Sequence, residues 1–205
     1  MNTWYIIAQV LGLITIIFEI ITYQIKDRTK FFMISSISSF FWLLMFIAIG
    51  LATGMDTQYS VMLAAAYSTL RNTLFWYMHK KDDPKTKERL LRVLLVMVAA
   101  SLVAGVFTVL AAPPQVRWLH ITGVIASVFF AISQYLPGVH AVRGGIVMTA
   151  VLLGLTQTPI NILEGDFRWN IMGIAIEAAK IISVVVFYIR FLSKPKEPQI
   201  ILAKP

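Results

Sequence analysis

The sequence contains no cysteine among its 205 residues, and this absence excludes disulfide bonds, thiolate chemistry and cysteine-ligated metal sites. Charged residues are also scarce, at 14%, whereas hydrophobic residues make up 58% and the mean hydropathy is +0.76. A soluble domain needs far more charge on its surface than this. The composition therefore indicates an integral membrane protein.

Motifs for catalysis and metal binding are missing as well. The chain has no Ser-His-Asp arrangement, no Gly-rich phosphate loop and no intramembrane motif of paired acids, so we predict no enzyme. His79, His120 and His140 are dispersed and lack ligand spacing to an acidic residue. We therefore predict neither a metal site nor a cofactor.

Long apolar runs fill most of the chain, at residues 4–25, 31–52, 58–78, 90–112, 117–136, 141–163 and 169–192. A hydrocarbon core ~30 Å thick needs about 20 helical residues to cross it, so each run predicts one transmembrane helix. No basic residue precedes the first run and no small-residue cleavage pattern follows it, so we expect a retained helix and not a signal peptide. Residues 79–88 form the only long hydrophilic connection, and Pro84 indicates a loop there.

The fourth run lies alone between two groups of three. A single odd helix makes both groups enter the membrane from the same side, so they would be parallel copies. We therefore predict an all-α membrane protein with seven transmembrane helices in a 3+1+3 plan, as two parallel three-helix bundles joined by a linker helix. A shift of 111 residues supports the duplication, because it superposes Gly12 on Gly123 and Gly54 on Gly165. The predicted parts are a first three-helix bundle at 1–78, a cytoplasmic loop and linker helix at 79–112, a second three-helix bundle at 113–192 and a cytoplasmic tail at 193–205.

The basic residues predict the orientation of the chain in the membrane. If the first hairpin loop is cytoplasmic, fourteen of the 18 lysines and arginines lie on that side, Arg143 included, against Arg117 and Arg168 outside. We therefore expect an extracytoplasmic N-terminus and a cytoplasmic C-terminus. This orientation and anionic lipid account for the net charge of +8, and no basic groove with interleaved aromatic residues predicts a nucleic-acid partner.

Four ionisable residues lie inside the predicted helices and away from their ends: Glu19, Arg71, Glu177 and Lys180. Charge in hydrocarbon is costly, so each should face the bundle interior. Glu177 and Lys180 are three residues apart on one helix face, close enough to meet. Glu19 and Arg71 are the predicted partners within the first bundle. The pattern is consistent with two structural ion pairs that fasten helices, and equally with a polar pathway that binds a solute between the bundles.

The predicted solute contacts are polar or aromatic residues of these helices: Trp42, Arg71, Asn72, Trp76, Asn161, Glu177 and Lys180. Trp42 and Trp76 could stack on a flat or sugar-like solute, although tryptophans near helix ends are commonly interfacial anchors. Glu19 or Glu177 could take up a proton during transport, because burial disfavours a charged carboxylate.

Several segments carry a family resemblance. The N-terminal half contains AQVLGLITIIFEIITYQIKDRTKFFMISSISSFFWLLMFIAIGLATG, then AAAYSTLRNTLFW with its Arg71 and Asn72, and a later INILEGDF precedes a helix with Glu177. In these segments the sequence resembles the bacterial inner-membrane proteins called the YgjV family. The resemblance covers most of the chain and implies a multi-pass protein of the bacterial inner (cytoplasmic) membrane. The 3+1+3 plan also resembles the SWEET sugar transporters, the PQ-loop transporters and the KDEL receptor.

These features together predict a transporter of a small polar solute that works by alternating access at a midplane site between two three-helix repeats. The alternative is a membrane receptor or protein-interaction module on the same fold, with no transport. In that case the basic segment from Lys80 to Arg92 would contact a protein or anionic lipid. The expected partners are a small polar solute and the lipid bilayer, and the small-residue helix faces would suit a homo-oligomer.

Overall fold

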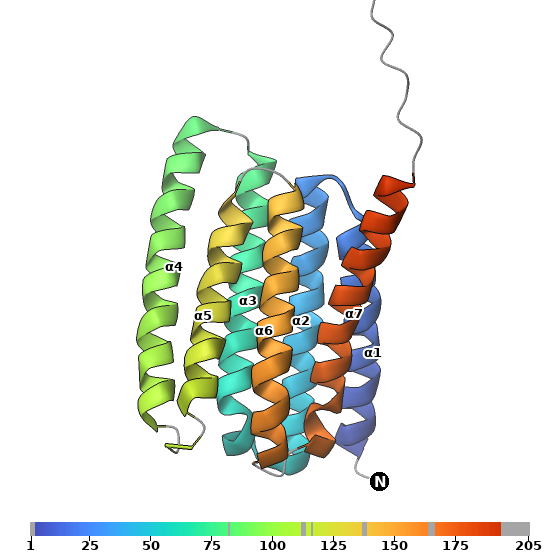
Figure 1. Ribbon diagram of the computed structural model, residues 1–205, viewed down its shortest axis with the longest axis vertical. Helices are drawn as coiled ribbons and strands as arrows, with labels where there is room; N and C mark the ends of the chain where they lie inside the picture. The colour runs from blue at the N-terminus through green and yellow to red at the C-terminus, as the bar shows by residue number, and fades with distance from the viewer. Residues whose placement is uncertain are drawn as a thin grey trace, which may run out of the picture.

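The computed structural model describes residues 3–81, 83–111, 114–115, 117–136, 139–163 and 167–193. These residues form seven helices and no strand (Figure 1): α1 Thr3–Gln24, α2 Arg28–Thr53, α3 Met55–Lys80, α4 Pro84–Ala111, α5 Arg117–Tyr135, α6 Val139–Leu163 and α7 Phe167–Leu192. The all-α prediction is confirmed for this part of the chain, and each helix lies over one predicted span. Apart from Ser193, the tail predicted at residues 193–205 lies outside the described residues.

The prediction of a loop at residues 79–88 is wrong. Helix α3 continues to Lys80, and α4 already begins at Pro84. Proline is tolerated at the first helical position, because its missing N–H would have no helical partner there. The Asp83 carboxylate caps this turn by accepting a hydrogen bond from the Lys85 backbone N–H at 3.3 Å. Most of the hydrophilic segment therefore belongs to the two helices.

The surface of the molecule is apolar. Three helical segments, Thr3–Gln24, Arg28–Thr53 and Pro84–Phe107, are long and apolar enough to cross a membrane. On α4 the side chains of Val96 and Phe107 are 68% and 67% exposed, which would be unfavourable in water. In the middle of the bundle Glu19, Arg71 and Asn72 are buried, whereas charges near the start of α4, such as Glu88 and Arg92, are exposed. This distribution is consistent with a helical membrane protein.

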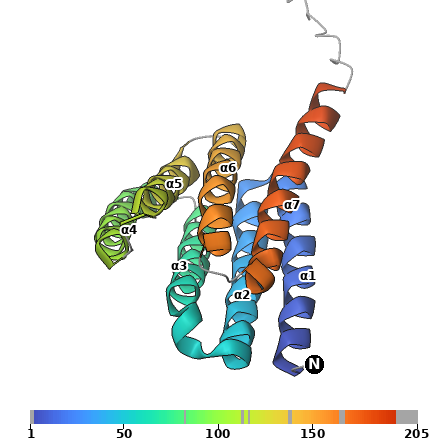
Figure 2. The ribbon, with the colours of Figure 1, turned by 60° about the horizontal axis from the view of Figure 1, so that its bottom comes forward.

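The helices pack in the order of the sequence. Each helix contacts the next one, and α7 packs against α1, so that the first and last helices lie side by side. Odd-numbered and even-numbered helices run in opposite directions (Figure 1). Figure 2 shows α7 beside α1 and α6 beside α5. Helix α2 packs against both α1 and α3 and lies between them.

Two apolar clusters form the core at different levels of the bundle. The seven-helix cluster takes buried residues from every helix: Tyr23, Phe31, Phe32, Phe75, Met78, Leu90, Leu94, Ala131, Val142, Ile146 and Val184. The four-helix cluster takes them from α1, α2, α3 and α7: Ala8, Met45, Phe46, Ala48, Ile49, Met62, Ala65 and Ile176. The seven-helix cluster lies where α1 and α3 end and where α2 and α4 begin. The four-helix cluster lies farther toward the opposite end of the same helices.

Helix ends recur at a fixed spacing. Gln24 ends α1, and Tyr135 ends α5, 111 residues later. Arg28 begins α2, and Val139 begins α6, again 111 residues later. The shift found in the sequence therefore also relates the helix boundaries of the two ends of the chain.

Helices α5 and α6 approach closely at Gly145, where a Cβ atom would lie 2.0 Å from the Cβ of Ser133. We predict that Gly145→Ala destabilises the protein by about 1–3 kcal/mol, because the extra methyl group overpacks this contact. Gly144→Ala is the matched control, since a Cβ there meets nothing within 4 Å. Thermal unfolding in detergent measures both variants, and equal midpoints would contradict the close contact.

Candidate functional site

A layer of polar residues separates the two apolar clusters. The polar layer consists of residues from α1, α2, α3 and α7: Thr15, Glu19, Ser35, Ser38, Ser39, Arg71, Asn72, Glu177 and Lys180. All seven residues that come from α1, α2 and α3 are buried, with exposed fractions of 7% or less. Along α2, for example, the sequence passes from Phe32 through the serines to Met45. The polar layer is therefore closed off by apolar packing at both ends.

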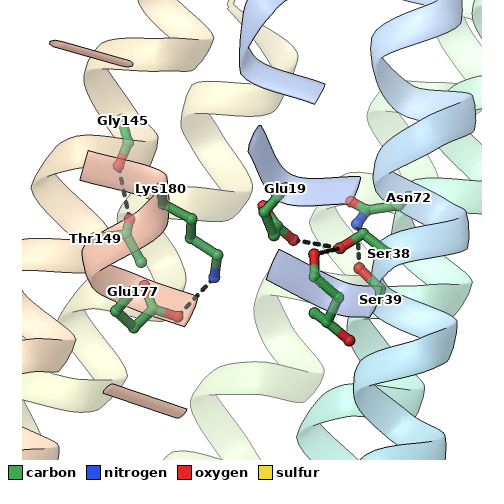
Figure 3. A network of polar contacts seen from close by, with 9 residues as sticks. Glu19, Ser38, Ser39, Asn72, Gly145, Thr149, Glu177 and Lys180 are labelled. Carbon is green, nitrogen blue, oxygen red and sulfur yellow. Dashed lines mark hydrogen bonds and ion pairs between the residues drawn. The ribbon is translucent and has the colours of Figure 1, made fainter. Parts of the chain in front are cut away.

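Glu19 lies on the inner face of α1, with 6% of its surface exposed. Its Oε1 accepts a hydrogen bond of 2.7 Å from Ser38 Oγ on α2 (Figure 3). Its Oε2 is buried and has no hydrogen-bond partner among the described residues. The phenol of Tyr23, one turn farther along α1, hydrogen-bonds to the Glu19 carboxylate and interacts electrostatically with Arg71. The carboxylate can still accept a further hydrogen bond, because Ser38 and Tyr23 do not fill all of its acceptor positions.

Arg71 is 3% exposed and turns toward α5. Its Cζ lies 4.2 Å from the ring centroid of Phe130 and 5.8 Å from that of Tyr67, which is cation–π geometry. Its Nε and Nη2 are buried and have no hydrogen-bond partner among the described residues. The guanidinium is therefore held by aromatic rings, and its Nε–Nη2 edge has no acceptor.

The predicted pairing of Glu19 with Arg71 is wrong. Glu19 bonds to Ser38, and Arg71 packs on aromatic rings. The reason lies in the helix order, because α2 separates α1 from α3. The helices that carry the two residues are therefore not direct neighbours.

The prediction that Glu177 and Lys180 meet is confirmed. Lys180 Nζ lies 2.6 Å from Glu177 Oε1, and both side chains are 16% exposed. The ammonium also lies 5.5 Å from the ring centroid of Trp42 and interacts electrostatically with Glu19 and Arg71. Figure 3 shows this pair of α7 on one side of Glu19, with the serines of α2 on the other.

Asn72 joins three helices. Its Nδ2 donates to Ser35 Oγ at 3.0 Å and to Ser39 Oγ at 2.8 Å on α2. Its Oδ1 accepts from Gln134 Nε2 of α5 at 3.2 Å. The serines were not predicted as site residues, although positions 35, 38 and 39 follow the helical spacing of one face. That spacing within an apolar run was the signal that could have identified them.

The other residues predicted to contact the solute do not all lie at the polar layer. Trp42 belongs with the polar layer, because its ring lies beside Lys180 and its buried Nε1 has no hydrogen-bond partner among the described residues. Trp76 packs on the seven-helix cluster, and Lys80 Nζ lies 5.6 Å from its ring centroid. Trp76 is therefore one turn or more from the polar layer. The side chain of Asn161 lies outside the described residues.

Arg143 was counted among the basic residues on the cytoplasmic side, and the structure shows that it is not a solvated charge. Its side chain is fully buried. Nε donates to the backbone oxygen of Tyr23 at 3.1 Å, and Nη2 donates to that of Ile25 at 2.6 Å. Cζ also lies 3.5 Å from the ring centroid of Phe187. Because the last carbonyls of a helix have no helical partners, Arg143 of α6 satisfies the end of α1.

Arg28 makes the reciprocal contact. Its Nη2 donates to the backbone oxygen of Gln134, at the end of α5. Gln134 is the position that the 111-residue shift superposes on Tyr23. An arginine near the start of α6 therefore holds the end of α1, and an arginine at the start of α2 holds the end of α5. We call these two contacts the arginine braces.

The described part of the chain shows no metal site, and its hollow outside the polar layer is apolar. There, no group of three or more histidine, cysteine, aspartate or glutamate residues could hold a metal ion. A hollow between α4 and α5 is lined only by apolar residues, including Val106 and Ile125, and offers no polar contact.

Comparison with protein-family models gives no match, and neither does comparison with curated proteins or with solved structures. Fold and site together define a helical protein with segments long and apolar enough to cross a membrane and with a buried polar layer.

We predict that Arg143→Met lowers the thermal stability of the purified protein in detergent. The variant loses two charge-assisted hydrogen bonds, each of which contributes about 1.5–3 kcal/mol. Arg92→Met is the control, because Arg92 forms an exposed ion pair with Glu88 that contributes about 0–1 kcal/mol. Unfolding midpoints that fall equally in both variants would contradict a stabilising role for this brace.

Proposed function

We propose that the protein transports a small polar solute by alternating access at the polar layer. The observation that carries this proposal is that four of the buried polar atoms without partners among the described residues gather at the polar layer: Glu19 Oε2, Arg71 Nε and Nη2, and Trp42 Nε1. A protein interior normally satisfies such atoms, because each one costs about 1–3 kcal/mol when unpaired. A solute that supplied the missing partners would recover this energy. An arrangement of two structural ion pairs alone would leave no such atoms.

The proposed plan is a pair of parallel three-helix repeats, α1–α3 and α5–α7, joined by the linker helix α4. The matching helix boundaries support it, and so do the arginine braces, whose acceptors at Tyr23 and Gln134 are equivalent under the same shift. Two further contacts end at equivalent positions, Ser183 of α7 and Asn72 of α3. Gln24 Nε2 of α1 donates to Ser183 Oγ at 3.0 Å, and Gln134 Nε2 of α5 donates to Asn72, although Gln134 is equivalent to Tyr23 and not to Gln24.

In the proposed cycle the two repeats move against each other about the polar layer. The arginine braces and the seven-helix cluster lie at the same end of the bundle, where α1 and α5 end. By the basic-residue bias this end is cytoplasmic, with the N-terminus outside and the C-terminus in the cytoplasm. The structure then corresponds to a state closed toward the cytoplasm. Opening would require the braces to release the carbonyl oxygens of Tyr23, Ile25 and Gln134. The resemblance to the YgjV family supports a bacterial inner-membrane location.

A proton would be carried on Glu19 or Glu177. Glu19 interacts with Ser38, Tyr23 and, electrostatically, the ammonium of Lys180, whereas Glu177 pairs directly with Lys180. A charged carboxylate is costly in a dry interior, so proton uptake and solute binding would compensate each other.

The second candidate function is a receptor that binds the same kind of ligand without moving it. Exposed basic residues at the junction of α3 and α4, such as Lys80, Lys81 and Lys85, favour this alternative, since they could contact an acidic partner or anionic lipid. Both candidates use the same polar layer, so flux across a membrane separates them.

We predict that proteoliposomes take up at least one of four probes, glucose, glycine, succinate or putrescine, offered singly, and that uptake changes the internal pH reported by a trapped dye. Glu19→Gln or Glu177→Gln should remove the pH change, because the amide side chain neither takes up nor releases a proton near neutral pH. Glu88→Gln, on the exposed face of α4, should behave like the unmodified protein. If none of the probes enters, the receptor is favoured. If both glutamine variants keep full proton movement, the proposed proton sites are wrong.

A further inference from the structure

We infer that the solute is a small zwitterion of the α-amino-acid type, whose carboxylate binds Arg71 and whose ammonium binds Glu19. This inference rests on the proposed function, in that it identifies the ligand class of the same polar layer. It starts from which atoms of the two side chains remain unpaired.

Arg71 presents a specific edge. Nε and Nη2, the two nitrogens without partners, lie on the same side of the guanidinium, and their N–H bonds point in parallel. This fork matches the two oxygens of a carboxylate, which it can bind through two hydrogen bonds. Phe130 and Tyr67 lie against the guanidinium and hold its orientation. A sugar hydroxyl or a cation has no comparable fit to this edge.

Glu19 presents the opposite charge. Its Oε1 is occupied by Ser38, while its Oε2 is buried without a partner among the described residues. An ammonium group donates three hydrogen bonds, and its positive charge would pair with the negative charge of this carboxylate. Tyr23 interacts with both Glu19 and Arg71, so the two charged groups border one region of the interior.

The charges of the polar layer favour a ligand that carries one positive and one negative group. Glu177 and Lys180 already neutralise each other at 2.6 Å, which leaves one cation of the polar layer, Arg71, and one anion, Glu19, without an ion-pair partner among the described residues. A simple carboxylate would pair Arg71 but leave Glu19 uncompensated, and a simple amine would do the reverse. An uncompensated buried charge is strongly unfavourable. A zwitterion satisfies both groups and leaves the net charge of the interior unchanged.

The test compares ligands that differ by one charged group. Alanine, propionate, ethylamine and glucose are offered separately to the purified protein in detergent, followed by glycine, leucine, glutamine and phenylalanine, each beside its deaminated and decarboxylated analogue. A ligand that binds only the folded state raises the unfolding midpoint. We expect at least one amino acid to raise it, and neither of its analogues to do so. The inference is wrong if no amino acid raises the midpoint, or if glucose or an analogue raises it as much as the best amino acid.

Variants of Arg71 and Glu19 then test which residue binds the carboxylate and which binds the ammonium group. Affinity is measured for the amino acid that raises the unfolding midpoint most. Arg71→Lys keeps the charge but loses the fork, and should weaken binding at least about tenfold, the loss of ~1.4 kcal/mol. Glu19→Gln should weaken amino-acid binding by about as much while leaving the deaminated analogue bound no more weakly than before. Arg92→Lys and Glu88→Gln, an exposed pair on α4, should change neither affinity. If a site variant fails to fold, the comparison of ligands on the unmodified protein still decides.

The outcomes separate this inference from the proposed function. Amino-acid binding without flux into proteoliposomes would overturn transport and leave the ligand class intact. Flux of glucose or putrescine without amino-acid binding would leave transport intact and overturn the ligand class.

Discussion

Charge that cannot reach water must find its partners inside the bundle, and the rest of this structure depends on that constraint. The outer surface is apolar, as Val96 and Phe107 show, so ionic side chains are directed inward. Some of them are fully paired there, as Glu177 is with Lys180. Glu19 and Arg71 are paired only in part, and their unused atoms give the polar layer its capacity to bind a ligand.

Backbone carbonyls at helix ends obey the same constraint. A helix that ends inside the bundle exposes oxygens that neither water nor lipid can satisfy. Arg143 and Arg28 supply donors to the ends of α1 and α5, and in doing so they join segments far apart in the sequence. The bonds that stabilise these ends also hold the two proposed repeats together at one end of the bundle. Any motion between the repeats would therefore have to break them, which couples the proposed gating to helix termination.

The sequence predicts what depends on local spacing and leaves open what depends on which helices are neighbours. Apolar runs identify all seven helices, and the i, i+3 spacing identifies the contact between Glu177 and Lys180. The pairing of Glu19 with Arg71 failed because it needed α1 beside α3, and no periodicity in the chain carries that information. The burial of Arg143 could not be predicted either, because it lies near the start of a predicted helix, where a solvated and a buried arginine have the same sequence context.

The most direct test of this account uses a nitroxide spin label at single cysteines, because the native chain contains no cysteine. Lys180→Cys and Ile182→Cys lie two residues apart on α7, at nearly the same membrane depth. The side chain of Lys180 is 16% exposed, and Ile182 is 63% exposed. In lipid vesicles, the label at position 182 should collide freely with dissolved oxygen, and the label at position 180 should be shielded from it. Equal access of oxygen to both positions would mean that the charge on α7 faces lipid, and would contradict the account.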